Sequence, residues 1–337
     1  PAARPSPPVL VALLRALARR SATGSGPGGV EGWVGGAARY PPGMARVELR
    51  NVANVEGAWF CDTRCIDCGT CREIAPETFG PARGHSVVHH QPEPGDEAAE
   101  LGAWLAAQAC PTTSIGTVDH RPRPGRLYPR EVEPGSGVFD VGYCAESSFG
   151  ASAWFVTRPD GNLLIDSPRW TEALARPFDE MGGIAHVLLT HRDDVADAHR
   201  YAERFGARVW IHADDQRAAP FATDLVEGGA GEPTAISPGV VAHPVPGHTR
   251  GSVVFVVDER FCFSGDSLAW SHDRGDLTAF RGATWFSWAE QTASLAALAE
   301  GTSFEWLLPG HGARAHLPAA EMHERLVALV ARMAAPP

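Results

Sequence analysis

The sequence predicts an α+β protein of two domains, and three observations lead to this prediction. The chain has 337 residues, which is more than one domain usually contains. Five of its seven cysteines fall between positions 61 and 110, whereas Cys144 and Cys262 stand alone. After position 137, short apolar runs group and then alternate with helical patterns, which is typical of two packed sheets with helices outside.

The composition excludes several classes of function. A hydrophobic content of 44% suffices for a core, and the Gly and Pro content stays below that of a disordered chain. The net charge of −11 argues against a nucleic-acid or anionic-membrane partner, because both need a basic surface. No apolar stretch approaches about 20 residues, so we expect no transmembrane segment. All 29 basic residues are arginine, which excludes P-loop and Schiff-base chemistry that depends on lysine.

The first 45 residues differ from the rest of the chain. They are rich in arginine, contain no acid before Glu31, and can form one short basic helix over 9–20. This composition is typical of a transit peptide, and the alternative is a disordered tail without a targeting role. We therefore expect an organelle location, with the chloroplast stroma ahead of the mitochondrial matrix, and otherwise a cytoplasmic one.

The cysteine spacing predicts a metal cluster. Cys65, Cys68 and Cys71 are separated by two residues each, and Cys110 follows with a proline after it. Two intervening residues let the backbone wrap a cubane so that successive thiolates point at different irons. Zinc also binds thiolates, but the third cysteine of the run favours an iron–sulfur cluster. We predict one [4Fe–4S] cluster on these four residues, with Cys61 as a small buried side chain beside it.

The segment CIDCGTCREIAPETFG, with AAQACPTTSIG further on, resembles single-cluster bacterial-type ferredoxins. This resemblance covers roughly residues 46–120 and implies a small βαβ-type sandwich, in which a helix over 96–109 leads into Cys110. The presence of Cys68 favours [4Fe–4S] over [3Fe–4S]. Residues 121–137 are rich in Pro, Gly and Arg and are predicted to be a linker.

The predicted second domain covers residues 138–337. Strands are expected over 150–157, 162–166, 186–190, 208–212, 240–244, 252–257, 260–264 and 304–308. Helices are expected over 171–181, 195–205, 288–299 and 319–333. Several strands are followed by the residue types that bind metals. The candidates are His191, Asp193, Asp194, Asp197, His248, Asp266 and His311.

Four segments carry these candidates in a characteristic order: LLTH, PVPGHTRGS, FCFSGDSL and LLPGHG. Their order resembles the metallo-β-lactamase superfamily, the glyoxalase II branch in particular, over residues 137–315. The resemblance implies an αββα fold. It also implies that Asp166, in the segment NLLIDSP, supports the metal site from behind the ligands.

The sequence departs from that family in its first motif, His-x-His-x-Asp-His. Here the register gives His191-Arg192-Asp193-Asp194-Val195-Ala196. The first metal site therefore keeps four residues: His191, Asp193, His248 and the bridging Asp266. The second keeps only Asp266 and His311, unless Asp194 or Asp197 replaces the lost aspartate in a shifted loop.

This count implies one mononuclear metal, which is iron or zinc, with manganese as a third choice. Asp193, Asp266 and His311 are the candidates for catalysis. An alternative is a decayed fold without a metal. We also expect an aromatic segment between Asp266 and His311 either to cover the site or to pack the outer helices. Its residues are Trp270, His272, Phe280, Trp285, Phe286 and Trp288.

Two classes of function remain open from the sequence. The first is a redox-coupled metalloenzyme, a hydrolase or an oxidoreductase, which acts on an unidentified small molecule and exchanges electrons with a redox partner protein. The second is a non-catalytic electron carrier or docking subunit, which the incomplete second metal site favours. The three histidines at positions 191, 248 and 311 favour the enzyme.

Overall fold

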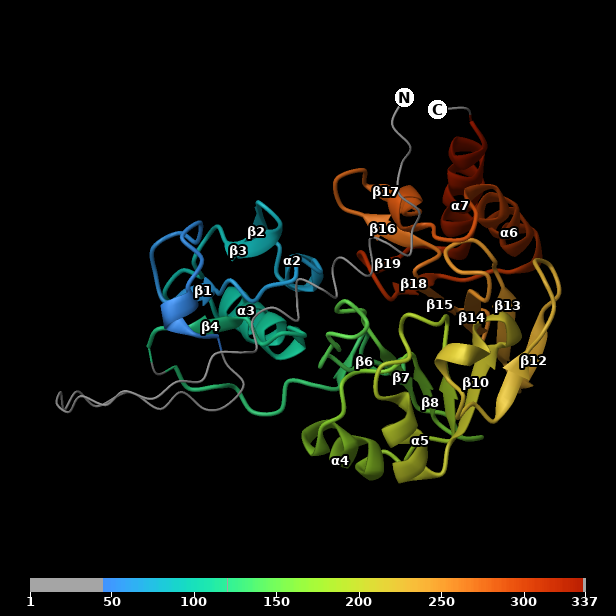
Figure 1. Cartoon of the computed structure of the whole chain (residues 1–337), viewed down its shortest axis with the longest axis horizontal. Coiled ribbons are helices and arrows are strands. Elements are labelled where there is room, and N and C mark those ends of the chain that lie inside the picture. Colours follow the sequence, from blue (N-terminus) through green and yellow to red (C-terminus); the bar gives the residue numbers. More distant parts are fainter. Residues whose placement is uncertain (1–44, 120, 336–337) are drawn as a thin grey trace, which may run out of the picture. The chain divides into compact units, whose positions relative to one another are not determined.

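The structure is a computed structural model, which describes residues 45–119 and 121–335 (Figure 1). The predicted tail or transit peptide therefore lies, except for its last residue, outside the described part. Residues 42–337 form one compact unit. Within the described ranges, no helix combines the length and the apolar character needed to cross a bilayer.

The first domain contains two small β-ladders and two helices. Its elements are η1 (Val47–Leu49), β1 (Trp59–Cys61), α2 (Thr70–Ile74), β2 (Phe79–Ala82), β3 (His85–Val88), α3 (Glu97–Ala109) and β4 (Ile115–Thr117). Strand β1 pairs antiparallel with β4, and β2 forms a hairpin with β3. Helix α3 begins one residue later than predicted, because Asp96 is its cap and accepts a hydrogen bond from the Ala99 N–H. The rings of Trp59 and Trp104 meet edge to face at 4.9 Å and hold β1 against α3.

The second domain contains two mixed sheets. The seven-stranded sheet has the order β11-β10-β9-β8-β7-β6-β5, in which β8 to β11 run parallel and the remaining pairs are antiparallel. Its strands are β5 (Arg130–Glu131), β6 (Val138–Asp140), β7 (Trp154–Val156), β8 (Leu163–Ile165), β9 (His186–Leu188), β10 (Arg208–His212) and β11 (Asp224–Val226). The six-stranded sheet has the order β12-β13-β14-β15-β18-β19. Its strands are β12 (Thr234–Ser237), β13 (Val240–Pro244), β14 (Val253–Val257), β15 (Phe261–Gly265), β18 (Trp306–Pro309) and β19 (Ala315–His316).

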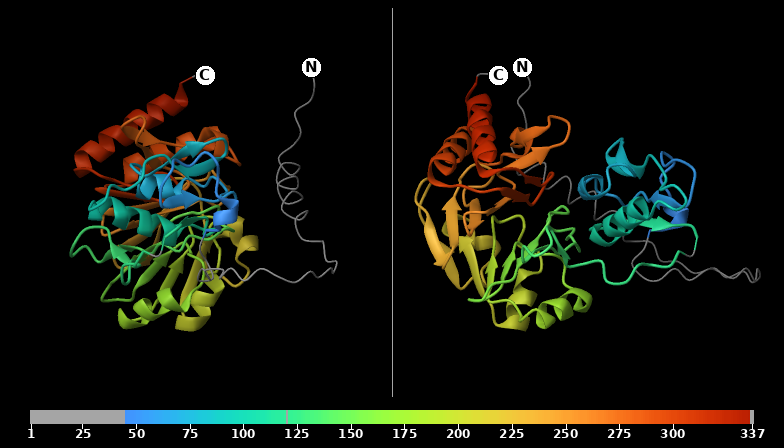
Figure 2. Two further views of the ribbon diagram at one scale, coloured as in Figure 1. Left: turned by 90° about the vertical axis from the view of Figure 1, so that its left-hand side faces the viewer. Right: turned by 180° about the vertical axis from the view of Figure 1, so that it is seen from behind.

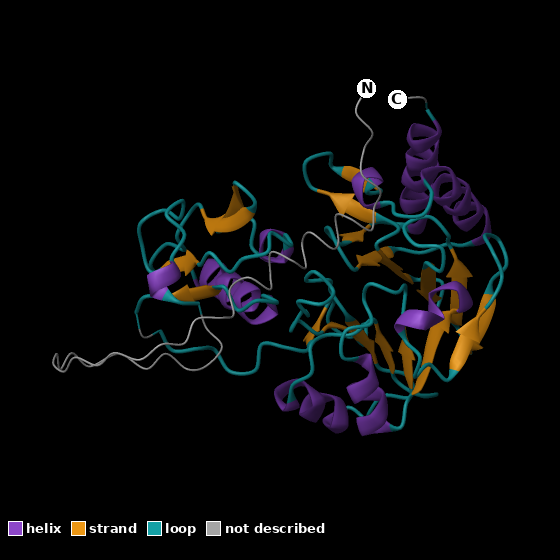
Figure 3. Ribbon diagram, viewed as in Figure 1, coloured by secondary structure: helices purple, strands orange, loops and turns teal. Residues whose placement is uncertain are grey.

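Helices cover the outer faces of both sheets, and the strands lie between them (Figure 3). Helices α4 (Glu172–Glu180) and α5 (Ala198–Phe205) pack on the seven-stranded sheet, whereas α6 (Trp288–Gly301) and α7 (Ala319–Ala334) pack on the six-stranded sheet. The shorter elements are η2 (Ala213–Ala218), the hairpin of β16 (Ala269–Ser271) and β17 (Asp276–Thr278), and η3 (Arg281–Ala283).

Apolar side chains from both sheets interdigitate in the centre of this domain. Trp154 and Leu188 from one sheet belong to the same buried cluster as Phe255 and Phe263 from the other. Trp154 and Phe263 meet with their ring centroids 6.4 Å apart. The layers are therefore helix, sheet, sheet and helix, as predicted, and a second view shows both outer pairs of helices (Figure 2).

Three local predictions differ from the structure. The predicted linker contains β5, which pairs with β6, so the seven-stranded sheet begins inside it. Helix α5 begins at Ala198 rather than Val195, because Ala196 has a φ of 36° and interrupts the helical turn. The β16–β17 hairpin and the edge strands β11, β12 and β19 were not predicted, because runs of two to four residues carry too little periodicity.

Candidate metal centres

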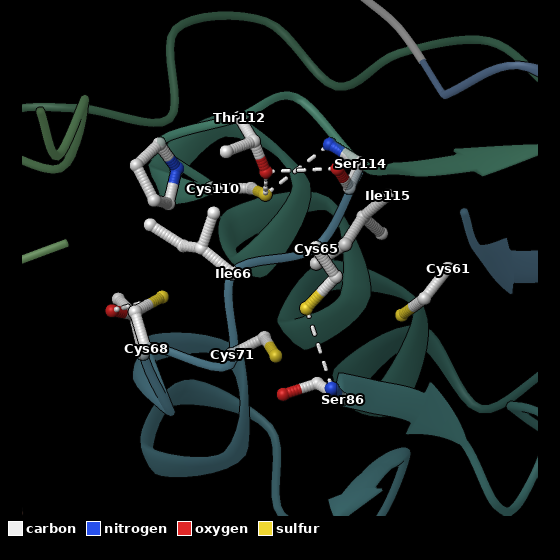
Figure 4. A pocket seen from close by; sticks show the side chains of 12 residues that line it. Cys61, Cys65, Ile66, Cys68, Cys71, Ser86, Cys110, Thr112, Ser114 and Ile115 are labelled. Atoms are coloured by element: carbon white, nitrogen blue, oxygen red, sulfur yellow. Dashed lines mark hydrogen bonds between the residues drawn. The ribbon is translucent and has the colours of Figure 1, made fainter. Parts of the chain in front are cut away.

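The predicted cluster cysteines surround one cavity in the first domain. Figure 4 shows the sulfurs of Cys65, Cys68, Cys71 and Cys110 around a common space. Cys65 and Cys68 come from the loop that enters α2, Cys71 lies in the first turn of α2, and Cys110 follows the end of α3. The loop turns tightly enough because Asp67 and Gly69 both adopt left-handed backbone conformations, with φ of 61° and 86°.

The donors around these sulfurs suit thiolates. Backbone N–H groups of Asp67 and Ser86 donate to the Cys65 sulfur over 3.4 Å and 3.3 Å. The Ser114 N–H donates to the Cys110 sulfur over 3.3 Å. Burial raises the pKa of Cys68, Cys71 and Cys110. Four such thiols ionise together only when a cationic group offsets burial and mutual repulsion, so the donor set fits an iron–sulfur cluster.

Cys61 also lines this cavity, from the end of β1. It stands at the edge of the group in Figure 4 and is fully buried. Burial, followed by the neighbouring cysteines, raises the pKa of Cys61 well above its ordinary value. The structure therefore places five sulfurs around the cavity, and our assignment of the fourth ligand to Cys110 rather than Cys61 stays a prediction.

The second set of candidates gathers at the ends of strands in both sheets. His191, Asp193 and Asp194 follow β9, and His248 lies between β13 and β14. Asp266 and His311 follow the neighbouring parallel strands β15 and β18. Because parallel strands end at the same edge of a sheet, residues that are distant in sequence meet here. Among the described residues, His191 forms two groups with metal-binding spacing. These groups are His191, Asp193 and His248, and His191, Asp194 and Asp266.

Four predicted metal ligands lie close together around the rings of His191 and His248. The distance from His248 Nε2 to an oxygen of Asp193 is 3.6 Å, and to an oxygen of Asp266 it is 3.7 Å. His191 Nε2 lies 3.8 Å from the same Asp266 oxygen. Both Nε2 atoms are buried and have no hydrogen-bond partner within the described part of the chain. A buried ring nitrogen without a partner is costly, so these atoms fit a metal ion, which would satisfy them.

The residues behind His191 fix its orientation. Thr190 Oγ1 lies 3.0 Å from His191 Nδ1 and donates to the carboxylate of Asp166, which also accepts from the Thr190 N–H over 2.8 Å. The arrangement is satisfied when Nδ1 carries the proton, which leaves the lone pair on Nε2. Burial lowers the pKa of His191 to about 4 and so favours the neutral ring that metals bind. Asp166 thus reaches the site through Thr190, a residue that the sequence analysis missed.

Asp194 is one of the two residues that the sequence offered as a replacement at the second site. It is buried, and neither carboxylate oxygen has a hydrogen-bond partner among the described residues. One of these oxygens lies 3.9 Å from His191 Nδ1. A side chain at Gly310 would approach oxygens of both Asp194 and Asp266 within 2.9 Å, which explains the glycine. Asp194 therefore places a buried carboxylate beside His191 and Asp266, where the sequence register had put Val195.

Asp197, the other predicted replacement, does not reach the metal site. Its carboxylate accepts the Trp170 N–H over 2.7 Å instead. Val195 lies in the core under α5. Of the two offered replacements, only Asp194 lies within metal-binding spacing of His191 and Asp266.

His311 lies beside the carboxylate of Asp266, with Nδ1 2.8 Å and 3.0 Å from its oxygens. Burial opposes the positive charge on this ring, but the Asp266 carboxylate outweighs burial and raises the pKa of His311. Burial likewise disfavours ionised Asp266, but His311, His191 and His248 outweigh it and lower the pKa of Asp266. His311 therefore contacts the centre through Asp266.

The aromatic segment divides between the two predicted roles. The Trp285 ring lies 6.2 Å from the ring of His248 and is 55% exposed, so it stands at the mouth of the site. Trp270 and Trp288 instead pack with the outer helices, where Trp288 donates to the backbone of Met333. His272 reaches Glu73 of the first domain over 3.4 Å.

Comparisons with known proteins agree with both domains. A family model described as "Metallo-beta-lactamase superfamily" matches residues 140–331. A second, described as "4Fe-4S single cluster domain of Ferredoxin I", matches residues 61–117. Both resemblances noted in the sequence are confirmed at the level of family and fold.

Individual relatives are distant. The "Uncharacterized protein YmaE" of Bacillus subtilis (strain 168) is 26% identical over 110 residues, which is 32% of this chain. The chain spans only 40% of the length of that relative. A metallo-β-lactamase from Erythrobacter litoralis, solved with beta mercaptoethanol in its active site, is 17% identical with a TM-score of 0.46 and covers 59% of this chain and 95% of its own. One from Hirschia baltica is 16% identical with a TM-score of 0.45 and covers 59% of this chain and 96% of its own.

Proposed function

Because this chain belongs to the metallo-β-lactamase superfamily and carries a single-cluster ferredoxin domain ahead of that fold, we propose that it is a redox-coupled metalloenzyme. Cys65, Cys68, Cys71 and Cys110 would hold one [4Fe–4S] cluster. One metal ion would be held in the second domain. Its proposed ligands are His191, Asp193, His248 and Asp266.

The observation that carries this proposal is the set of unsatisfied atoms at the second centre. His191 Nε2, His248 Nε2 and both oxygens of Asp194 are buried without a hydrogen-bond partner. A docking scaffold gains nothing from such atoms, because each one left unpaired costs about 1–3 kcal/mol of folding free energy. Retaining them is understandable when a metal ion satisfies them.

Two histidines with carboxylates suit both iron and a catalytic zinc, whereas a structural zinc takes mostly thiolates. We propose iron as the resident metal because iron, unlike zinc, can exchange single electrons with a cluster; zinc and manganese are the alternatives. Asp194 forms a second group with His191 and Asp266, which would bind a metal more weakly because the carboxylate of Asp266 is already paired with His311.

When bound, the cluster supplies single electrons and the metal polarises a coordinated substrate. The chain's own residues orient the side chains that would bind the metal. Thr190 holds His191 in the tautomer that exposes Nε2, and His311 fixes the carboxylate of Asp266. Asp193 is the exposed member of the set, with 49% of its side chain accessible, so a small-molecule substrate would approach from its side, next to Trp285.

The test is metal analysis of anaerobically purified protein. We expect metal in excess of the iron of one cluster, and His248→Ala should lose that excess while its cluster spectrum stays intact. His243→Ala is the matched control, because His243 lies on β13 of the same domain outside both centres. Cluster iron alone in the wild type would contradict the enzyme and favour an electron-carrier or docking subunit.

We also propose that an external redox protein donates electrons to the cluster. The predicted cluster would accept them directly, so the proposal requires no additional cofactor.

The organelle location stays a prediction, which a fusion of residues 1–45 to a fluorescent protein would test.

A further inference from the structure

A loop of the second domain, residues 144–152, links the two centres, and we call it the bridging loop. Its first end is tied to the backbone beside a cluster cysteine: the Cys144 N–H donates to Ala109 O over 3.1 Å. Arg169 reinforces this end by donating to Cys110 O and Cys144 O over 2.9 Å and 2.7 Å. The other end is tied to the second centre, because the Ser152 N–H donates to Gly310 O over 2.7 Å.

The tip of the bridging loop lies directly against a cluster ligand. A Cβ atom at Gly150 would fall 2.7 Å from the Cys68 sulfur, so only glycine fits here, and its φ of 86° also favours glycine. Thr70 joins the two residues: its Oγ1 lies 3.3 Å from the Cys68 sulfur and donates to Gly150 O over 2.8 Å.

Phe149, which precedes Gly150 in the bridging loop, contacts the second centre. His311 Nε2 lies 3.3 Å from Phe149 O, and the two rings lie 6.2 Å apart. His311 Nδ1 lies 2.8 Å from Asp266 Oδ1. Phe149 adopts a φ of 51°, which is unfavourable for a bulky residue, and its side chain is 52% exposed, so packing of the ring does not explain the conformation. The conformation places the Phe149 carbonyl at His311.

Cys68 and His311 also border the same small cavity, of about 60 Å³, which Thr70 and Gly310 line as well. The two centres are therefore separated by one layer of residues rather than by a domain core. A continuous path of covalent and hydrogen bonds crosses this layer. It runs from Cys68 through Thr70, the peptide between Phe149 and Gly150, and His311 to Asp266.

We propose that this path carries electrons between the two centres, an inference that rests on the proposed function. One electron passes from a reduced [4Fe–4S]⁺ cluster, which becomes [4Fe–4S]²⁺, to a ferric ion at the second centre, which becomes ferrous. A one-electron donor protein then returns an electron to the cluster; dithionite replaces this donor in the test. Covalent and hydrogen bonds couple electronic states better than empty space, which is why each contact in the path matters.

The key variant is Thr70→Val, which keeps the shape of the side chain but removes the hydroxyl that joins Cys68 to Gly150. Thr70→Ser keeps the hydroxyl. Thr112→Val is the matched control, because Thr112 Oγ1 lies 3.6 Å from the Cys110 sulfur but contacts no residue of the bridging loop in the described structure. If the Thr70→Val protein fails to hold a cluster, Thr70→Ala replaces it in the experiment, because alanine also lacks the hydroxyl and has a smaller side chain.

The experiment loads both centres with iron, oxidises the protein, and adds less than one equivalent of dithionite. Rapid freeze-quench electron paramagnetic resonance follows the loss of the cluster signal and of the ferric signal. A redox titration of each variant corrects for any change in the cluster potential. We expect transfer in Thr70→Val to be about tenfold slower than in the wild type, equivalent to about 1.4 kcal/mol of activation free energy. Thr70→Ser and Thr112→Val should transfer at the wild-type rate.

The possible results separate this path from the proposed function. Wild-type transfer that is unchanged in Thr70→Val and Thr70→Ala overturns the path and leaves the metalloenzyme intact. Equal slowing in Thr112→Val also overturns it, since the effect would then come from the cluster environment in general. Absence of a second metal overturns both, whereas two loaded centres without any transfer overturn the electron coupling alone.

Discussion

Replacing Thr190 by valine tests how the second centre holds its metal. Valine has the shape of threonine, so the substitution leaves no cavity. It removes a hydroxyl group that makes two hydrogen-bonding contacts. Thr190 Oγ1 lies 3.0 Å from His191 Nδ1 and donates to Asp166 over 2.9 Å. Without this hydroxyl, His191 loses the partner that fixes its tautomer and ring orientation.

The size of the effect follows from these contacts. Loss of such a supporting partner typically weakens metal binding by about 10–100-fold. That range corresponds to about 1.4–2.7 kcal/mol of binding free energy. The buried Nδ1 proton of His191 would also lose its acceptor, which should lower the free energy of unfolding of the metal-free protein by about 1–3 kcal/mol. Asp166 keeps the Thr190 N–H at 2.8 Å, so the strand itself should persist.

The assay is competition with a chelator, on protein whose cluster is intact and whose second centre has been emptied. Thermal unfolding of the same samples measures the stability change. Thr190→Ser, which keeps the hydroxyl, should bind metal with nearly wild-type affinity. The reasoning is refuted if Thr190→Val binds metal as tightly as the wild type, or if Thr190→Ser loses as much affinity as Thr190→Val.

Three further predictions follow from the same geometry. Cys68→Ala should abolish the visible cluster absorption or leave a three-iron spectrum, whereas Cys61→Ala should retain the four-iron spectrum; the opposite pattern would show that the ligand register is wrong. Asp194→Asn should lower the metal content of the second centre less than His248→Ala does, and equal complete loss in metal analysis would make Asp194 a primary ligand. Asp62 accepts hydrogen bonds from Arg64 and from a backbone N–H, which outweigh burial and hold its pKa below the ordinary 3.8. Its stabilising effect should therefore be present above pH 3.8 and disappear as the pH falls through the lowered pKa; acid unfolding of Asp62→Asn, monitored by circular dichroism, should lack this step, and an unchanged acid limb would count against the assignment.

Much of this protein is determined by features that are local in its sequence. The Cys65–Cys71 run with the later Cys110–Pro pair predicted the cluster domain, because that spacing alone sets which thiolates a short loop can present together. The segments around His191, His248 and His311 carried the resemblance that implied the αββα fold. Each segment contains an apolar strand followed by a polar residue. The same few positions therefore predict both the strand and the candidate site residue.

The tertiary structure decided what depends on loop conformation and on contacts between distant segments. After His191 the chain turns so that Asp194 lies close to Asp266. Val195 packs in the core instead, and Asp197 accepts the Trp170 N–H. No periodicity in the sequence reports such a turn. The role of the bridging loop could not be predicted from the sequence either. Gly150 contacts Cys68, and Phe149 contacts His311, only after folding brings these distant segments together. Spacing determines which atoms a short segment can present together, but packing between the domains determines which two centres become neighbours.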